Sequence, residues 1–324
     1  MTVIEHASEC AAVHAGLAGQ PIAVLGGGSN VLCATSNMSH VLQIAIQGID
    51  LVRQTDEAHY VKVGAGESWH GVVLHTLAQG WAGLENLALI PGWAGAAPVQ
   101  NIGAYGVELA DRLHSVAAWD MQTASHVEIE CADCQFGYRD SVFKRQAGRY
   151  WITALTLRLP RPWRAVLDYA DLAALKTENP SPQNICDAVV AIRSRKLPDP
   201  ATIPNAGSFF KNPVVSAALV AELKAAHPTL PAYPQPDGTV KLAAGWLIEQ
   251  CGWKGHRAAH APVGVHAAQA LVLVHDIYSA QGVQASASQT AAKGADLLAL
   301  AEAIQSSVRE RFRVELQHEV NVWR

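Results

Sequence analysis

The sequence predicts an α+β fold that is divided into more than one domain. Strand-like and helix-like segments are mixed along the chain, without the regular alternation that produces a doubly wound parallel sheet. The length of 324 residues exceeds what one hydrophobic core usually holds, which favours two or three domains. Apolar residues make up 50% of the chain and charged residues 16%, so burial can offset chain entropy and gross disorder is not expected.

Local patterns predict the individual elements. Apolar runs and alternation predict strands over 22–25, 41–46, 60–64, 151–159 and 270–274, and strand-like backbone over 314–322. Helical periodicity predicts helices over 69–79, 183–196, 216–226, 243–251 and 296–312. Ser68 can cap the first of these helices, and Pro182 suits the first turn of the second. The stretch 279–290, rich in Ala, Ser and Gln, is expected to be a surface loop.

The charge and hydropathy of the chain argue against several functional classes. The formal net charge is -4, so there is no basic excess to attract a nucleic acid. No apolar run approaches the roughly 20 residues that a membrane helix needs. The N-terminal residues lack the basic start and apolar segment of an export signal. We therefore expect a cytoplasmic protein that binds neither nucleic acid nor a membrane.

The six cysteines are scattered and form no regular disulfide framework, which fits reduced thiols in the cytosol. Cys131 and Cys134 have the spacing of half a zinc site. No second pair of Cys or His follows at a zinc-finger distance, so ordinary packing is preferred and no metal is expected.

Two glycine-rich regions are candidates for ligand binding, the first at 25–32 and the second at 83–106. Leu25-Gly-Gly-Gly-Ser-Asn-Val-Leu32 lets the backbone approach a phosphate closely, although a plain turn is the more common use of such a motif. Val31 stands where a nicotinamide-binding fingerprint needs its third glycine, which weakens a Rossmann interpretation. The segments 83–92 and 95–106 combine small residues with Gln100 and Asn101, whose amides can fix the polar edge of a flat cofactor.

Two further segments carry reactive side chains. Arg139, in Phe136-Gly-Tyr-Arg-Asp-Ser-Val-Phe-Lys144, can bind a carboxylate or phosphate with two hydrogen bonds, or can pair with Asp140 or Glu130 at the surface. Ser208, in Asn205-Ala-Gly-Ser-Phe-Phe-Lys-Asn-Pro213, can point a hydroxyl into a dry pocket. A hydrolase is disfavoured because no Gly-x-Ser-x-Gly elbow is present.

Together with Lys241-Leu-Ala-Ala-Gly-Trp-Leu-Ile-Glu-Gln, these segments resemble one family along residues 3–322. The family is that of the UDP-N-acetylenolpyruvoylglucosamine reductases (MurB), in its longer type I form. The resemblance implies a two-subdomain FAD-binding fold of the PCMH/VAO type plus a third α+β domain for substrate. Residues 1–47, rejoined by 317–324, would form the first FAD subdomain, 48–197 the second, and 198–316 the substrate domain.

The resemblance also implies the reaction. In this family NADPH delivers hydride to FAD, and the reduced flavin then passes it to the vinyl carbon of an enolpyruvyl UDP-sugar. The product is UDP-N-acetylmuramate, a precursor of bacterial peptidoglycan. We expect a monomer that binds FAD, NADPH and the UDP-sugar substrate.

Individual roles carry over to matching residues. By resemblance, Arg139 and Glu319 stabilise the enolate-like charge, and Ser208 donates the proton to the neighbouring carbon. FAD contacts are expected at Gly26, Gly27, Gly28, Ser29, Asn30, Ile90, Pro91, Gly92, Gln100, Asn101, Gly103 and Ala104. Substrate contacts are expected at Tyr105, Tyr169, Lys196, Asn212, Tyr233 and Gln269, with a solvated linker lysine as the alternative for Lys196.

The chain departs from the family pattern at one cofactor segment. Ala96 and Ala97 stand where hydroxyl residues are common near the flavin diphosphate, which removes hydrogen bonds worth about 1 kcal/mol each.

Two alternatives to the reductase remain. A flavin oxidase of a sugar or hydroxy acid is disfavoured by the acid groups Ser208 and Glu319, and a ligand-binding protein without activity is disfavoured by the presence of Arg139 as well.

Overall fold

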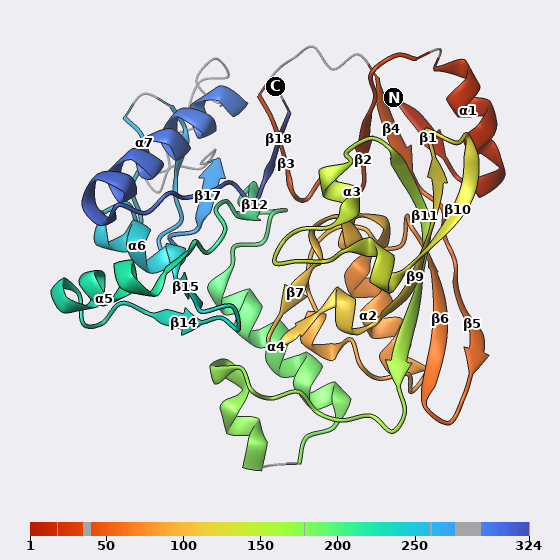
Figure 1. Ribbon diagram of the computed structural model, residues 1–324, viewed down its shortest axis with the longest axis horizontal. Coiled ribbons are helices and arrows are strands. Elements are labelled where there is room, and N and C mark those ends of the chain that lie inside the picture. The colour runs from red at the N-terminus through yellow and green to blue at the C-terminus, as the bar shows by residue number, and fades with distance from the viewer. Residues whose placement is uncertain (18, 35–39, 178, 260, 276–292, 324) are drawn as a thin grey trace. The chain divides into compact units, whose positions relative to one another are not determined.

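The computed structural model describes residues 1–17, 19–34, 40–177, 179–259, 261–275 and 293–323. The chain divides into two compact units (Figure 1). The first consists of Met1–Gly28 and Asn37–Arg193, and the second of Ser29–Ser36 and Ser194–Arg324. Helices and strands are mixed in both units, which confirms the α+β prediction. The division into three domains stays a prediction, and the loop expected over 279–290 lies outside the described residues.

A small parallel sheet lies near the N-terminus of the first unit. Its strand order is β1 (Thr2–Ile4), β4 (Val41–Ile44) and β2 (Ala23–Leu25). The short helix α1 (Cys10–Gly16) follows β1. The sheet and helix bury Ile4, Cys10 and Leu42 in a cluster that also contains Trp119 and Trp151.

The largest sheet of the first unit, among the residues that the structure describes, has five antiparallel strands (Figure 1). Its order is β10 (Ser125–Glu130), β9 (Leu113–Asp120), β11 (Tyr150–Pro160), β6 (Ala58–Gly64) and β5 (Ile49–Gln54). Helices α2 (Trp69–Ala78) and α4 (Pro182–Lys196) share the core cluster of this sheet, to which they contribute Val72 and Val189. The Ser68 side chain accepts a hydrogen bond from the Gly71 N–H, which confirms the predicted cap of α2.

Short elements connect these strands and helices. They are η1 (Ala7–Glu9), η2 (Glu85–Leu87), η3 (Ala94–Gln100), β7 (Gly103–Ala104), β8 (Val107–Glu108), η4 (Leu109–Asp111), η5 (Cys131–Cys134), α3 (Val142–Arg145) and η6 (Ala170–Thr177). Strands β7 and β8 pair as a two-residue antiparallel ladder. Of the twelve residues predicted to bind FAD, Gln100, Gly103 and Ala104 lie on these short elements, and the other nine lie in bends, turns or irregular segments.

The second unit has three small sheets. Their orders are β12 (Asn205–Ser208), β17 (Val272–His275), β16 (Val263–Val265); β13 (Val214–Ser216), β15 (Thr239–Leu242), β14 (Ala232–Pro234); and the parallel pair β18 (Asn321–Trp323) with β3 (Val31–Cys33). The helices are α5 (Ala217–Ala226), α6 (Ala244–Gln250) and α7 (Gly294–Phe312). Leu300, Ile304, Val308 and Phe312 recur every four residues and form the buried face of α7, as the periodicity predicts.

The five helices and five strands predicted from the sequence are all present, with ends shifted by at most two residues. The strand-like segment over 314–322 is the exception, because only β18 at its end is a strand. Val314 and Leu316 are 1% and 2% exposed, so their alternation reflects burial. The Leu316 carbonyl accepts a hydrogen bond from Gln305 Nε2 at 2.7 Å, so a side chain takes the place of a strand partner.

Candidate functional site

The two glycine-rich segments lie against each other in the first unit. A Cβ added to Gly27 would lie 3.0 Å from Cδ1 of Trp93 and 3.3 Å from the Gly92 Cα, and one added to Gly26 would lie 3.3 Å from the Ala96 Cβ. A side chain on either glycine would be tightly packed against residues 92–96, which would have to move by about a few tenths of an ångström to make room. The structure therefore brings together two segments that the sequence predicts to bind one cofactor.

The second glycine-rich region is hydrogen-bonded, at Ala94 and Gly95, to the backbone that follows β6. Ala94 N–H donates to the Glu67 carbonyl at 2.8 Å, and Gly95 N–H donates to the Ala65 carbonyl at 2.9 Å. A Cβ on Gly95 would lie 2.6 Å from the Ala65 Cβ, so a side chain there would push the segment away. The result is a backbone surface built from small residues, which fits the flat, phosphate-bearing FAD that the resemblance implies.

Two predicted substrate residues meet in the first unit. The rings of Tyr105 and Tyr169 are in edge contact, with centroids 5.1 Å apart. The fully buried Asn86 holds this region, because its Nδ2 donates to the carbonyls of Tyr105 at 2.8 Å and Val166 at 2.9 Å. Sequence reasoning missed Asn86, although it lies inside the motif 83–92.

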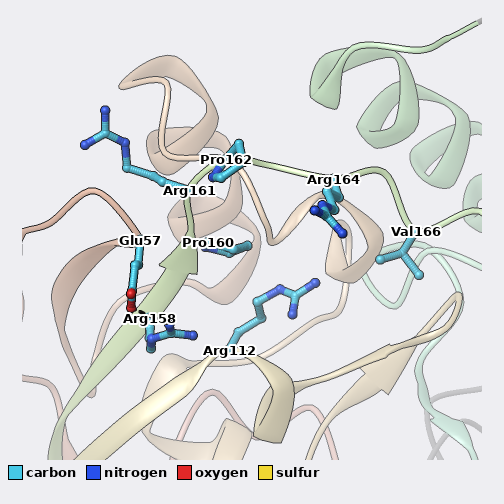
Figure 2. A pocket seen from close by; sticks show the side chains of 8 residues that line it. All are labelled: Glu57, Arg112, Arg158, Pro160, Arg161, Pro162, Arg164 and Val166. Carbon is cyan, nitrogen blue, oxygen red and sulfur yellow. Dashed lines mark ion pairs between the residues drawn. The ribbon is translucent and has the colours of Figure 1, made fainter.

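A basic pocket of about 430 Å³, which the sequence did not predict, lies beside this region (Figure 2). It is lined by Glu57, Arg112, Arg158, Pro160, Arg161, Pro162, Arg164 and Val166. Arg112 Nε donates to the Gly83 carbonyl at 2.9 Å and Arg161 to the Thr55 carbonyl at 3.0 Å. Four guanidinium groups against one carboxylate give this pocket a positive potential that attracts anionic ligands.

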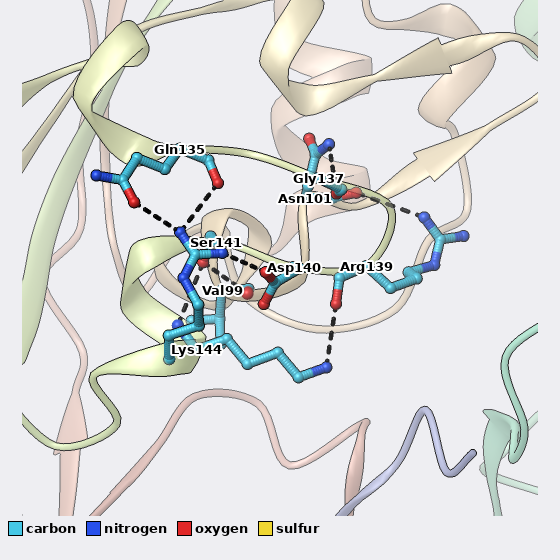
Figure 3. Close-up of polar contacts among 9 residues, drawn as sticks. Val99, Asn101, Gln135, Gly137, Arg139, Asp140, Ser141 and Lys144 are labelled. Carbon is cyan, nitrogen blue, oxygen red and sulfur yellow. Dashed lines mark hydrogen bonds and ion pairs between the residues drawn. The ribbon is translucent and has the colours of Figure 1, made fainter. Parts of the chain in front are cut away.

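Asn101 adopts a left-handed backbone conformation, with φ of 43°, and is 1% exposed. Its Nδ2 donates to Glu108 Oε2 at 2.7 Å and to the Gly137 carbonyl at 3.3 Å, and its Oδ1 accepts from Ala110 N–H at 3.0 Å. Figure 3 shows Asn101 next to Gly137. The amide is thus bonded within the protein and fixes the turn, while its expected contact with the cofactor stays a prediction. Gln100 is also buried.

Arg139 lies beside the predicted cofactor segment (Figure 3). Its guanidinium donates to the carbonyls of Gly103 at 3.0 Å and Asn101 at 3.4 Å. The residue has φ of 54°, and its own carbonyl accepts from Lys144 Nζ at 3.1 Å. Both bonds hold the Arg139 guanidinium against the backbone of the predicted cofactor segment.

The loop that carries Arg139 is fixed on both sides. The buried Ser141 hydroxyl donates to the Val99 carbonyl at 2.8 Å and accepts from Lys144 N–H as the cap of α3. Asp140, the alternative partner considered for Arg139, forms an ion pair with Arg145. The local pairing therefore leaves Arg139 directed at residues 101–103.

Ser208, Glu319 and Asn30 come together in the second unit. Glu319 N–H donates to the carbonyl of Phe209 at 2.8 Å, so Glu319 lies across from the residue that follows Ser208. Asn30 Nδ2 donates to the Glu319 carbonyl at 3.3 Å. Gly207, with φ of 71°, lies in β12 where its pairing with β17 shifts register, just before the half-buried Ser208. The segments that carry three residues predicted from separate motifs thus lie next to one another.

Two predicted substrate residues meet at the start of α6. Asn212 Oδ1 accepts from Ala244 N–H at 3.0 Å, and Gln269 Oε1 would lie 3.2 Å from a Cβ on Gly245. Tyr233 is half exposed on β14, and Lys196 is the last residue of α4. The substrate roles of these four residues stay predictions.

The cysteines of the described chain are free thiols. Cys134 is buried, its thiol donates to the Glu130 carbonyl, and burial raises its pKa to about 12. Within the ranges described, no three His, Cys, Asp or Glu side chains are grouped to hold a metal ion. The same residues contain no helix with the length and hydropathy to span a membrane.

Comparison with known proteins gives consistent matches. Residues 4–129 match the family model of an FAD binding domain, and residues 199–323 match that of the UDP-N-acetylenolpyruvoylglucosamine reductase C-terminal domain. Relatives with the name UDP-N-acetylenolpyruvoylglucosamine reductase include those of Dechloromonas aromatica, 51% identical over 91% of this chain and 86% of the relative, and Cupriavidus pinatubonensis, 53% identical over 93% and 86%. The one from Bordetella pertussis is 52% identical over 92% and 82%.

A solved structure extends the likeness to the fold. The crystal structure of UDP-N-acetylenolpyruvylglucosamine reductase (MurB) from Thermus caldophilus matches with a TM-score of 0.65. The match covers 99% of this chain and 91% of that one, at 24% identity.

Proposed function

Because the chain belongs to the UDP-N-acetylenolpyruvoylglucosamine reductase family and is an FAD-dependent oxidoreductase, we propose that it reduces UDP-N-acetylenolpyruvoylglucosamine to UDP-N-acetylmuramate with NADPH. The product serves peptidoglycan precursor synthesis. We further propose that the enzyme acts as a monomer in the cytoplasm and binds neither nucleic acid nor a membrane.

Bound FAD supplies the hydride that is taken from NADPH and given to the vinyl carbon. We assign its binding to the glycine turn 26–28, to Ser29 and Asn30, and to the segments 90–92, 100–101 and 103–104. The close packing of Gly27 on Gly92 supports this assignment, because it joins two of these segments into one surface of backbone N–H and small side chains.

Hydride addition to a vinyl carbon beside a carboxylate builds negative charge on the substrate. In our proposal Arg139 stabilises that charge with its permanently positive guanidinium, which its bonds to the Asn101 and Gly103 carbonyls hold beside the predicted cofactor segment. Glu319 assists Arg139 at the developing charge, and Ser208 gives a proton to the adjacent carbon. A hydroxyl is a weak acid, but an enolate is a strong base and the geometry is preset.

The UDP part of the substrate is assigned to Tyr105, Tyr169, Lys196, Asn212, Tyr233 and Gln269. The edge contact between Tyr105 and Tyr169 supports a nucleotide-covering role in the first unit. Lys196 would serve as a point charge for a diphosphate.

The observation that supports the proposal most is the backbone bond from Glu319 N–H to the Phe209 carbonyl, because it pairs the segment that carries Glu319 with the segment that carries Ser208. The test is NADPH consumption under anaerobic conditions, with and without the enolpyruvyl UDP-sugar. We expect NADPH alone to bleach the visible flavin band once, and the UDP-sugar to restore the colour and sustain consumption. A protein that turned over only with oxygen would instead be an oxidase, and one whose flavin NADPH did not bleach would lack the proposed activity.

A further inference from the structure

The segment 87–92 is tied to the first residue of α2 at both ends. The Trp69 indole Nε1 donates to the Leu87 carbonyl at 3.1 Å, and the Trp69 backbone N–H donates to the Gly92 carbonyl at 3.0 Å. Trp69 is 1% exposed, so both bonds are buried with it. The segment includes Ile90–Gly92, which we assign to FAD.

Leu89, in the middle of this segment, has a left-handed backbone with φ of 57°. A bulky residue seldom adopts this conformation, which persists only where the surroundings impose it. His70 Nδ1 accepts the Leu89 N–H at 3.0 Å, and Arg193 Nε donates to the Leu89 carbonyl at 3.3 Å. Side chains from α2 and α4 therefore hold both polar groups of the strained residue.

Both helices are firmly placed in the core of the first unit. Val72 and Val73 of α2 and Val189 of α4 are fully buried in one cluster. Arg193, in the last turn of α4, is itself half-buried, and desolvation is the main cause that lowers its pKa. The anchors of Leu89 are thus rigid elements rather than mobile loops.

We propose that His70 and Arg193 are positioning residues for the cofactor, which hold Leu89 left-handed and thereby set the path of Ile90–Gly92 against FAD. This inference rests on the proposed function, since it takes that segment to bind FAD. It adds two side chains from outside the glycine-rich motifs to the machinery that retains the cofactor.

The role of His70 depends on its protonation, because only an unprotonated Nδ1 can accept the Leu89 N–H. Burial first, and then the charge of Arg193, lower the pKa of His70. Arg193 of α4 is the charged group that acts on His70 within the described chain. The contact should therefore persist below the ordinary histidine value of about 6.5 and be lost at more acid pH, as the pH falls through the lowered pKa.

The first test measures the FAD dissociation constant of the full chain from the quenching of flavin fluorescence at neutral pH. His70→Leu removes the acceptor, and we expect it to weaken FAD binding about tenfold, as the loss of one hydrogen bond would. His70→Asn keeps an acceptor oxygen and should bind FAD nearly as wild type does. His75→Leu is the matched control, since His75 lies on the same helix and its ring packs near that of Trp81. Arg193→Met should weaken binding in the same direction as His70→Leu.

The second test compares the pH dependence of FAD binding in the wild type and in the conservative variant His70→Asn. FAD affinity of the wild type should fall at acid pH, whereas that of His70→Asn, which does not titrate, should fall less. Equal acid profiles would overturn the inference, as would wild-type affinity in His70→Leu or equal weakening in His75→Leu. If the wild type bound FAD and His70→Leu bound it with the same affinity, only the positioning role would be rejected. A wild type that bound no FAD would overturn the proposed function as well.

Discussion

Asp120 and Arg149 form a bidentate ion pair in which the Asp120 carboxylate is almost fully buried. Arg149 Nε donates to both carboxylate oxygens at 3.1 and 3.2 Å, and its NH2 donates to Oδ2 at 2.7 Å. Asp120 is 3% exposed and ends β9. The pair joins the end of β9 to the residue before β11, so it holds two central strands of the large sheet together.

Asp120→Asn should reduce the free energy of unfolding by about 2 kcal/mol at neutral pH, because it removes charge-assisted bonds from a buried group. The Arg149 hydrogen bonds are the main cause that lowers the pKa of Asp120 below 3.8. The pKa of Asp120 is lower in the folded protein than in the unfolded chain. The ionised carboxylate therefore contributes to the free energy of unfolding above the unfolded-state pKa, and this contribution is lost as the pH falls through the folded-state pKa. Urea unfolding at neutral and acid pH measures both effects.

Glu57→Gln is the control for this prediction. Glu57 and Arg158 form an ion pair at 3.8 Å, and the Glu57 side chain is 84% exposed. Solvent screens such a pair, so we expect a change of less than about 0.5 kcal/mol. Equal losses in the two variants, or an Asp120→Asn loss that did not shrink in acid, would contradict the assignment.

Gly95→Ala should lower both the melting temperature and the FAD content of the purified protein. Its Cβ would lie 2.6 Å from that of Ala65, and neighbouring backbone must move to make room. Gly16→Ala, where nothing lies within 4 Å of the added Cβ, should leave FAD content unchanged and stabilise α1 by about 0.5–1 kcal/mol. Thermal unfolding and the ratio of flavin to protein absorbance compare the two. Normal FAD content in Gly95→Ala would contradict the close approach.

Asn101→Ala should destabilise the first unit by about 2–4 kcal/mol, because it removes three hydrogen bonds and leaves alanine in a left-handed conformation. Asn101→Gly loses the same amide without the steric strain. In denaturant unfolding, the glycine variant should therefore have a free energy of unfolding about 1 kcal/mol higher than that of the alanine variant. The reverse order would show that the backbone conformation is not strained.

Ser208→Ala should separate the two halves of the proposed reaction. Reduction of the flavin by NADPH should be unchanged, while its reoxidation by the UDP-sugar should slow by about 10²–10⁴, the usual contribution of a proton donor. Ser307→Ala, on α7 of the same unit, should react as wild type does. Anaerobic stopped-flow absorbance follows each half-reaction. Wild-type reoxidation in Ser208→Ala would remove Ser208 as the donor.

Local patterns in the sequence predicted most of the secondary structure because helix caps and periodicity act over a few residues. Ser68 begins α2 as expected, and the apolar face of α7 follows its four-residue spacing. The failure at 314–322 has a physical cause. Alternating burial of Val314 and Leu316 looks like a strand in the sequence, but it arises without a ladder partner.

The candidate site was predicted as separate motifs, and the contacts between them were not predictable. The bond from Glu319 to Phe209 joins residues far apart in sequence, and nothing local specifies it. The left-handed backbone of Leu89 and Tyr105 also carries no sequence signal, since both types normally avoid it. His70, Asn86 and Arg193 act on backbone groups of other segments, so their importance appears only in three dimensions.

The pairing of β3 with β18 bears on how the protein is made. Val31 aligns with Asn321, so β3 can form its pair only after residues about 290 positions later in the sequence have been synthesised. During synthesis β3 emerges early, and its edge stays unpaired until Asn321–Trp323 has also left the ribosome. Such a distant closure carries a high entropic barrier, so assembly of the second unit should be a late and slow event in the life of the nascent chain.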